Sequence, residues 1–181
     1  MSPRLFIALD ISDEVRARVA EAVIRERASV DAKWARPEGL HLTLVFFGPT
    51  PLEKIGELVA TSTSVAARHR PLRLEIAGAG TFDTRVLWLG VGGELQPLQA
   101  LAADLGRALG VVSDHPEYRP HLTLARSLQR SGDPMLTQVA RRLERKSFGA
   151  FGVKQLTLYE SVGGAYRALA AIPLQAPDQG G

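Results

Sequence analysis

The chain has 181 residues, of which 45% are hydrophobic and 23% are charged. This composition is typical of one globular domain and excludes a wholly disordered or fibrous protein. The sequence contains no cysteine, which excludes disulfides, thiolate nucleophiles and zinc–thiolate sites. The net charge is +3, and 18 of the 22 basic residues are arginine. This mildly basic balance permits a nucleic-acid partner without requiring one.

No apolar run approaches the ~20 residues that a membrane-spanning helix needs. The apolar segment Leu5–Leu9 is also too short for the central region of a signal peptide. We therefore expect a cytoplasmic protein that has no membrane partner. We also expect it to act as a monomer.

Hydrophobic periodicity and turn residues predict a mixture of helices and strands. In chain order, we expect a strand at Arg4–Leu9, a helix capped by Ser12 that runs to about Val30, a short segment at Trp34–Arg36, a strand at Leu40–Phe47, a helix capped by Thr50 that runs to about Ala67, strands at Leu72–Ile76 and Val86–Val91, a helix at Leu95–Leu109, a strand at His121–Ala125, a helix capped by Asp133 that runs to about Ser147, and strands at Val153–Tyr159 and Tyr166–Ile172. Most strand connections look like hairpins, which favours an α+β fold over a parallel sheet. Residues 1–175 are expected to form one domain, and residues 176–181 a polar tail without fixed structure.

One motif occurs twice in the chain. Pro37-Glu38 precedes His41-Leu42-Thr43-Leu44, and Pro116-Glu117 precedes His121-Leu122-Thr123-Leu124. The two histidines are 80 positions apart, and a helix is expected after each copy. This repeat predicts two similar lobes that face each other across a cleft.

In a strand, successive side chains point to opposite faces, so each copy places two leucines on one face and a histidine with a threonine on the other. The leucine face suits a core, and the repetition of the other face points to function. The remaining histidines, His69 and His115, have no such partner and are expected at the surface or in loops.

Two histidine–threonine pairs suit phosphoryl chemistry. Because the imidazole pKa lies near neutrality, one histidine can act as general base while the other acts as general acid. Threonine hydroxyls can donate hydrogen bonds to anionic oxygens as charge builds on them. Two histidines without clustered carboxylates fit a metal site poorly, so we expect neither a metal nor another cofactor. No nucleophile elbow supports a serine-type triad.

The two His-Leu-Thr-Leu motifs resemble the paired His-x-Thr/Ser-x motifs of the 2H phosphoesterase superfamily. Within it they most resemble the RNA 2′,3′-cyclic phosphodiesterases, also described as 2′-5′ RNA ligases. Further resemblance to this family covers nearly the whole chain and lies in Arg4-Leu5-Phe6-Ile7-Ala8, Trp34 with Pro37-Glu38, Phe46-Phe47-Gly48, Arg85-Val86-Leu87-Trp88, Pro120-His121-Leu122-Thr123-Leu124-Ala125-Arg126 and Pro173-Leu174.

The resemblance implies an α+β fold of two lobes, each an antiparallel sheet backed by helices, related by a pseudo-twofold axis around a central cleft. It implies hydrolysis, without metal, of an RNA or nucleotide 2′,3′-cyclic phosphate to a 2′-phosphomonoester. It further implies that His41 is the proton donor and His121 the proton acceptor, and that Thr43, Thr123 and Arg126 contact the phosphate. On a regular strand Arg126 has the wrong parity to share a face with His121, so that strand must end or bend there.

Several alternatives remain open from the sequence. The corresponding ligation, which joins a 5′-hydroxyl end to the cyclic phosphate through a 2′-5′ bond, is expected only as a weak side activity. The protein is alternatively a nucleotide- or RNA-binding module without turnover, or a phosphodiesterase for another small cyclic phosphate. Of the aromatic residues near the motifs, Tyr118 is a candidate for stacking on a base, whereas Phe46 and Phe47 fit a core position better.

Overall fold

The computed structural model of the protein describes residues 2–111 and 118–175. Its elements are, in chain order, β1 (Arg4–Asp10), α1 (Asp13–Arg27), β2 (Ala32–Trp34), β3 (His41–Pro49), α2 (Ile55–Ala66), β4 (Leu72–Phe82), β5 (Val86–Gly93), α3 (Leu95–Ala108), β6 (His121–Ser127), α4 (Pro134–Leu143), β7 (Ser147–Val153), β8 (Gln155–Val162) and β9 (Ala165–Pro173). Short 3₁₀ turns precede β3 and α2, at Pro37–Gly39 and Leu52–Lys54. The expected tail and His115 lie outside the described residues.

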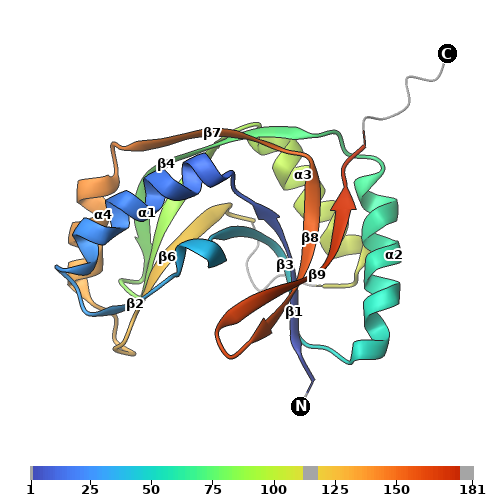
Figure 1. Ribbon diagram of the computed structural model, residues 1–181, viewed down its shortest axis with the longest axis horizontal. Helices are drawn as coiled ribbons and strands as arrows, with labels where there is room; N and C mark the ends of the chain where they lie inside the picture. The colour runs from blue at the N-terminus through green and yellow to red at the C-terminus, as the bar shows by residue number, and fades with distance from the viewer. Residues whose placement is uncertain (1, 112–117, 176–181) are drawn as a thin grey trace.

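The strands form two antiparallel sheets, as Figure 1 shows. The four-stranded sheet has the order β3-β1-β8-β9, and the five-stranded sheet has the order β2-β6-β5-β4-β7. In the first, α2 packs on β8 and β9 and α3 packs on β3. In the second, α1 packs on β7, and α4 packs on β4 and β5. The expected α+β fold of two lobes, each a sheet backed by helices, is confirmed.

The chain passes repeatedly between these two units, which we call the four-stranded lobe and the five-stranded lobe. After β1 it leaves the four-stranded lobe, places α1 and β2 in the five-stranded lobe, and returns with β3. After β5 it leaves the five-stranded lobe, places α3 against β3, and returns with β6. Each lobe therefore depends on segments from both halves of the sequence.

The core lies between each sheet and its helices. β1 is an inner strand of its sheet, and its residues Leu5–Leu9 are all buried. Leu42 and Leu122 of the two motifs are also fully buried. Their burial confirms that the leucine face of each motif points into the core and leaves the histidine face for another role.

One predicted strand is too short and one strand was missed, and the ladder of each contains a β-bulge. β4 continues beyond Ile76 to Phe82, because the register shift between Ile76 and Ala79 lets the glycine-rich segment pair with β5. β7 was not predicted: it occupies the stretch between the expected helix end at about Ser147 and the expected strand at Val153–Tyr159, and α4 already stops at Leu143. Its ladder with β4 has a shift beside Gly149, whose φ is +113°, so Phe148 and Phe151 are both buried without a regular period of two.

The helix ends also differ from the expectation. Ser12 and Asp133 cap α1 and α4 as predicted, since each side chain accepts a hydrogen bond from a backbone N–H of the first turn. Thr50 does not cap α2, because its hydroxyl donates to the carbonyl of Gly48 (3.0 Å) and a 3₁₀ turn intervenes. Helix α1 ends at Arg27, earlier than Val30. No helix in the described parts of the chain combines the length and apolar character needed to cross a bilayer.

Candidate active site

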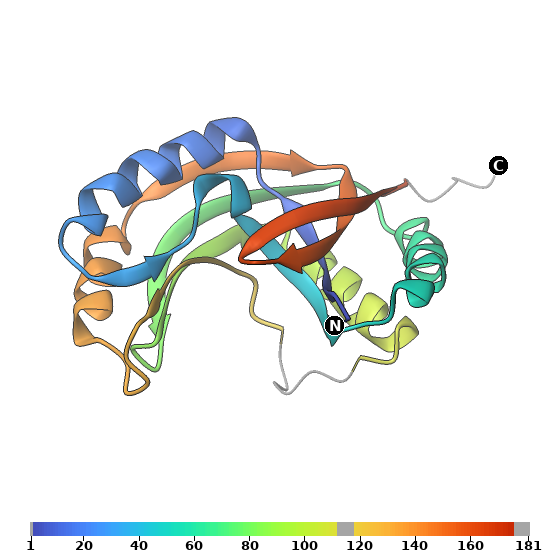
Figure 2. The ribbon, with the colours of Figure 1, turned by 60° about the horizontal axis from the view of Figure 1, so that its bottom comes forward.

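The two motif strands, β3 and β6, pack against each other where the lobes meet. His41, Thr43, His121, Thr123 and Arg126 all line one cleft there, with a volume of about 590 Å³. Figure 2 shows the two sheets curving around the side of the molecule on which these strands meet. The structure thus brings together every site residue that the sequence predicted, from two segments 80 positions apart.

Both histidines are held in the same way. Nδ1 of His41 lies 2.7 Å from the carbonyl oxygen of Gly39, and Nδ1 of His121 lies 2.7 Å from that of Arg119. A carbonyl can only accept, so Nδ1 carries a proton in each ring. Nε2 is then the nitrogen that gains or loses a proton, and each histidine can serve as either acid or base through it.

The ring of His41 lies in a dense aromatic setting. It stacks on Phe6 at a centroid distance of 4.8 Å and packs perpendicular to the ring of Tyr166 at a centroid distance of 4.9 Å. Its Nε2 lies 3.1 Å from Oγ1 of Thr43. Burial lowers the pKa of His41 below its ordinary value, and the Gly39 carbonyl and the Asp10 carboxylate oppose this shift in part. His121 contacts a single aromatic neighbour among the described residues, the perpendicular ring of Phe82 at a centroid distance of 5.0 Å.

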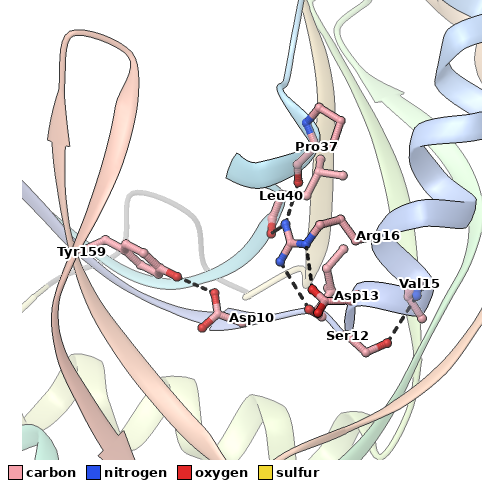
Figure 3. A network of polar contacts seen from close by, with 9 residues as sticks. Asp10, Ser12, Asp13, Val15, Arg16, Pro37, Leu40 and Tyr159 are labelled. Carbon is pink, nitrogen blue, oxygen red and sulfur yellow. Dashed lines mark hydrogen bonds and ion pairs between the residues drawn. The ribbon is translucent and has the colours of Figure 1, made fainter.

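A carboxylate is fixed behind His41. Asp10 of β1 is the register partner of His41 and accepts hydrogen bonds from the hydroxyls of Thr157 (2.9 Å) and Tyr159 (2.5 Å). Figure 3 shows the Asp10–Tyr159 contact. Burial, together with this bond to Asp10, raises the pKa of Tyr159 to about 12. Asp10 therefore faces hydroxyls that remain protonated, and its negative charge acts on His41 through space.

Arg16 of α1 holds the backbone that precedes His41. Its Nη1 donates to the carbonyls of Pro37 (2.6 Å) and Leu40 (3.3 Å), as Figure 3 shows. Its Nη2 donates to the carbonyl of Ile11 (3.3 Å). The Gly39 carbonyl that orients His41 lies between the two anchored residues of this turn. One guanidinium thus links α1 to the orientation of the imidazole.

A β-bulge in each motif strand explains the position of Arg126. Thr123 and Ala125 of β6 pair with two consecutive residues of β5, so Leu124 is an extra residue without a partner in this ladder. Leu124 and Ala125 are both buried, and Arg126 returns to the face of His121. The bend that the sequence required for Arg126 is therefore present. β3 has the same bulge at Leu44, opposite β1.

The bulge in β3 corrects the expectation for Phe46. This residue occupies the position that Arg126 has in the other motif, lines the cleft and is 47% exposed, so it is not a core residue. The guanidinium of Arg4 lies 5.2 Å from its ring centre. Phe47 is partly buried against the core, as expected.

Tyr118, the candidate for stacking on a base, makes a structural contact instead. It is partly buried against the core, and its hydroxyl donates to the carbonyl of Thr43 across the two lobes (3.0 Å). Burial raises the pKa of this hydroxyl, so it stays protonated and remains a donor.

Sequence reasoning missed much of the cleft wall. Arg4 and Lys33 add positive charge to it, and Ser161, Gly164 and Tyr166 contribute from the β8–β9 hairpin. Lys33 gave no sequence signal, because it reaches the cleft only through the pairing of β2 with β6, where it lies opposite Arg126. The residues that line this cleft, all from the described part of the chain, include no Asp or Glu, so the cleft favours an anionic ligand.

The other histidine in the described residues lies elsewhere. His69 is in the turn after α2, as expected for a loop, but its side chain is only 14% exposed and its Nε2 lies 2.9 Å from Asp104. Across residues 2–111 and 118–175, no three or more His, Cys, Asp or Glu side chains gather as metal ligands would.

Comparison with known proteins identifies the family. A model of the 2′-5′ RNA ligase superfamily matches residues 11–165. The chain belongs to the 2′-5′ RNA ligase superfamily. The family resemblance seen in the two motifs is thereby confirmed.

Relatives within this superfamily match over most of their length. The chain is 30% identical over 166 residues to a protein of Archaeoglobus fulgidus named RNA 2′,3′-cyclic phosphodiesterase, covering 88% of this chain and 91% of the relative. The fold of this chain is similar to that of TT0787 of Thermus thermophilus (TM-score 0.75, 26% identity, 97% of this chain and 100% of TT0787). It is also similar to LigT of E. coli complexed with 3′-AMP (TM-score 0.73, 27% identity, 97% and 100%).

Proposed function

We propose that this protein hydrolyses the 2′,3′-cyclic phosphate of RNA ends or nucleotides to a 2′-phosphomonoester. The observation that carries the proposal is the pair of histidines in one cleft, each with Nδ1 bonded to the carbonyl two residues earlier. The relatives named RNA 2′,3′-cyclic phosphodiesterase and the 3′-AMP complex of LigT support the same substrate class.

The proposed reaction needs one proton acceptor and one proton donor. Neutral His121 takes a proton at Nε2 from a water molecule, whose oxygen forms a new bond to phosphorus. The bond from phosphorus to O3′ breaks, and O3′ receives the proton of Nε2 of His41. The products are a 2′-phosphomonoester and a free 3′-hydroxyl. General acid and base catalysis by two such groups contributes about 10²–10⁴-fold each.

The other predicted residues hold the charged phosphate. Thr43 and Thr123 lie on the same strand faces as the histidines and can donate hydroxyl hydrogen bonds to the two non-bridging oxygens. Arg126 supplies a guanidinium beside them, which suits a phosphate through parallel donors. In this scheme the proton transfers are complete without a metal ion, so activity in the presence of EDTA is expected.

A 5′-hydroxyl can replace water as the nucleophile in the same cleft. The product is then a 2′-5′ linkage, as in the name of the superfamily. We expect this ligation to be a weak side activity, because water competes for the same position.

The first experiment tests turnover directly. The purified protein is incubated in EDTA with a short RNA ending in a 2′,3′-cyclic phosphate and, separately, with a cyclic mononucleotide, and the phosphomonoester is identified by chromatography. We expect a 2′-phosphate from both. Binding without turnover would support the binding-module alternative, and a 3′-phosphate would show that the opposite bond breaks.

Substitution of the two histidines tests the mechanism. We expect His41→Ala and His121→Ala each to lower kcat by about 10²–10⁴-fold, with the double variant far from additive because the two act as a unit. His69→Ala is the matched control, since His69 contacts Asp104 outside the cleft and its loss should leave kcat unchanged. Near-wild-type activity in either single variant would remove that histidine from the mechanism.

A further inference from the structure

A second hollow adjoins the cleft on the five-stranded lobe. It has a volume of about 570 Å³ and lies between the β4–β5 turn and the segment that follows β6. Both segments are at the lower left tip of the molecule in Figure 2. The lining residues, which we call the arginine groove, are Phe82, Asp83, Arg85, Val86, Arg126, Ser127, Leu128, Gln129 and Arg130.

The two walls of the arginine groove are fixed to each other. The backbone N–H of Ser127 donates to the carbonyl of Arg85, and that of Asp133 donates to the carbonyl of Thr84, both at 2.8 Å. Gly132 has a φ of +86°, and a Cβ built on it would collide with Oγ1 of Thr84. Only glycine allows this approach, so the hollow is a packed feature of the fold.

The groove carries net positive charge. Arg85, Arg126 and Arg130 line it together with one carboxylate, Asp83. Arg85 and Asp83 approach to 3.4 Å, but their side chains are 58% and 81% exposed. An exposed pair of this kind is weak, so Arg85 can exchange its partner for a ligand at little cost.

The groove is continuous with the catalytic cleft. Arg126 lines both hollows, and Phe82 lines the groove while its ring packs perpendicular to that of His121. A chain that leaves the cleft past Arg126 therefore meets Arg85 and Arg130 next. The cleft alone can hold a terminal nucleotide, and the groove offers contacts only to a longer ligand.

We propose that the arginine groove binds the phosphodiester backbone of an RNA strand on the 5′ side of its terminal, cyclic-phosphate-bearing nucleotide. The inference rests on the proposed function and extends it to the substrate class: RNA ends are preferred to free cyclic nucleotides. Arginine suits this role because its planar guanidinium bonds phosphate oxygens in a bidentate manner. Such backbone contacts raise affinity without reading sequence.

Two charge-removing variants, Arg85→Gln and Arg130→Gln, test the groove. We expect each to lower kcat/KM for an RNA with a 2′,3′-cyclic phosphate end by about fivefold to tenfold, and to change kcat/KM for a cyclic mononucleotide by less than about twofold. The salt dependence of RNA binding should also flatten, by about 0.7 in the slope of log affinity against log salt per lost phosphate contact.

Arg141→Gln is the matched control, because Arg141 is an exposed arginine of α4 that lines neither hollow. It removes the same charge and should leave both substrates unaffected. Equal effects on RNA and mononucleotide, no effect on RNA, or an effect of Arg141→Gln as large as that of the groove variants would overturn the proposal.

A binding measurement separates this inference from the proposed reaction. Fluorescence anisotropy of a labelled RNA ending in a 2′-phosphate reports on the groove whether or not turnover occurs. If no substrate is hydrolysed but Arg85→Gln and Arg130→Gln still weaken RNA binding, the reaction is wrong and the groove stands. If the wild type hydrolyses both substrates and neither variant weakens RNA binding, the groove is wrong and the reaction stands.

Discussion

At the scale of single residues, the two lobes give their histidines the same tether and different surroundings. The carbonyl two residues earlier holds Nδ1 of both rings. Only His41 is enclosed by several aromatic rings of the described residues, and this burial lowers its pKa. An anionic phosphate in the cleft opposes that shift, because it favours the protonated ring. A bound phosphate therefore increases the protonated fraction of His41, which the proposed role as proton donor requires.

The assignment of His41 as donor can be tested through Asp10, whose charge raises the pKa of His41. In Asp10→Asn the pKa of His41 falls further. At alkaline pH the rate is proportional to the protonated fraction of the donor, so kcat/KM should decrease there. At acid pH it is proportional to the neutral fraction of the acceptor, so it should not change. The measurement is the pH profile of kcat/KM for a cyclic mononucleotide.

The opposite result would reverse the two roles. If Asp10→Asn increased kcat/KM on the acid side and left the alkaline side unchanged, His41 would be the acceptor. Asp13→Asn is a suitable control, because Asp13 is a fully exposed carboxylate that lies 3.8 Å from Arg16. Its profile should match that of the wild type.

At the scale of elements, bulges and a helix position the site. The bulges at Leu44 and Leu124 reverse the strand parity, which places Phe46 and Arg126 on the histidine faces. Helix α1 acts on the same region through Arg16, which joins two backbone carbonyls of the turn before β3 to the carbonyl of Ile11, between β1 and α1. Local backbone geometry therefore determines where the side chains of the cleft point.

Arg16→Lys tests the contribution of α1. Lysine keeps the charge that acts on His41 but has no planar fork to join three carbonyls, so the Gly39 turn should loosen. We expect kcat to fall by about 10-fold to 100-fold with a smaller change in KM, since small displacements of a catalytic group cost this much. The readout is the steady-state kinetics of cyclic mononucleotide hydrolysis.

Arg18→Lys provides the matched control for this variant. Arg18 is on the same helix, is exposed and contacts only the side chain of Glu14 among the hydrogen bonds of the described residues (2.6 Å). Unchanged kcat in Arg16→Lys, or an equal loss in Arg18→Lys, would show that the guanidinium clamp does not position His41.

At the scale of the whole molecule, the site exists only because the two lobes are held in one arrangement. Helix α1 follows a strand of the four-stranded lobe but packs on the five-stranded lobe, and α3 follows a strand of the five-stranded lobe but packs on β3. The chain itself therefore connects the lobes at both helices. The hydroxyl of Tyr118 adds a direct bond to the carbonyl of Thr43 across the two lobes. These links set the separation of the two histidines.

Tyr118→Phe should loosen that arrangement. Loss of one hydrogen bond to a partly buried carbonyl should lower the free energy of unfolding by about 1 kcal/mol. Because β3 and β6 each carry one histidine, loosening them should displace the two rings relative to each other. We expect kcat to decrease by about 10-fold, which is more than a loss of about 1 kcal/mol of stability would cause. Urea unfolding and steady-state kinetics measure the two effects separately.

Thr63→Val serves as the control, because it removes one hydroxyl-to-carbonyl bond within α2, to Val59 (2.8 Å), away from the cleft. It should alter stability slightly and leave kcat unchanged. A Tyr118→Phe variant that lost stability but kept full kcat would show that this bond stabilises the fold without aligning the site.

The sequence by itself determined the local features of this protein. The period-two pattern of the motifs predicted the buried leucines and the polar face, and the repetition predicted two lobes around a cleft. The period-two pattern involves only a few neighbouring residues, and the repetition is visible by comparing two stretches of the sequence. The capping residues Ser12 and Asp133 were recognisable for the same reason, since each acts on the turn that follows it.

Features that depend on strand pairing were decided only by the tertiary structure. Lys33 reaches the cleft because β2 pairs with β6, and Arg126 does so because β6 has an extra residue against β5. The same kind of bulge moved Phe46 out of the core. A bulge depends on the partner strand, so the parity of a single strand cannot reveal it. Strand β7 escaped detection for this reason, and the arginine groove exists only where two turns distant in sequence are packed together.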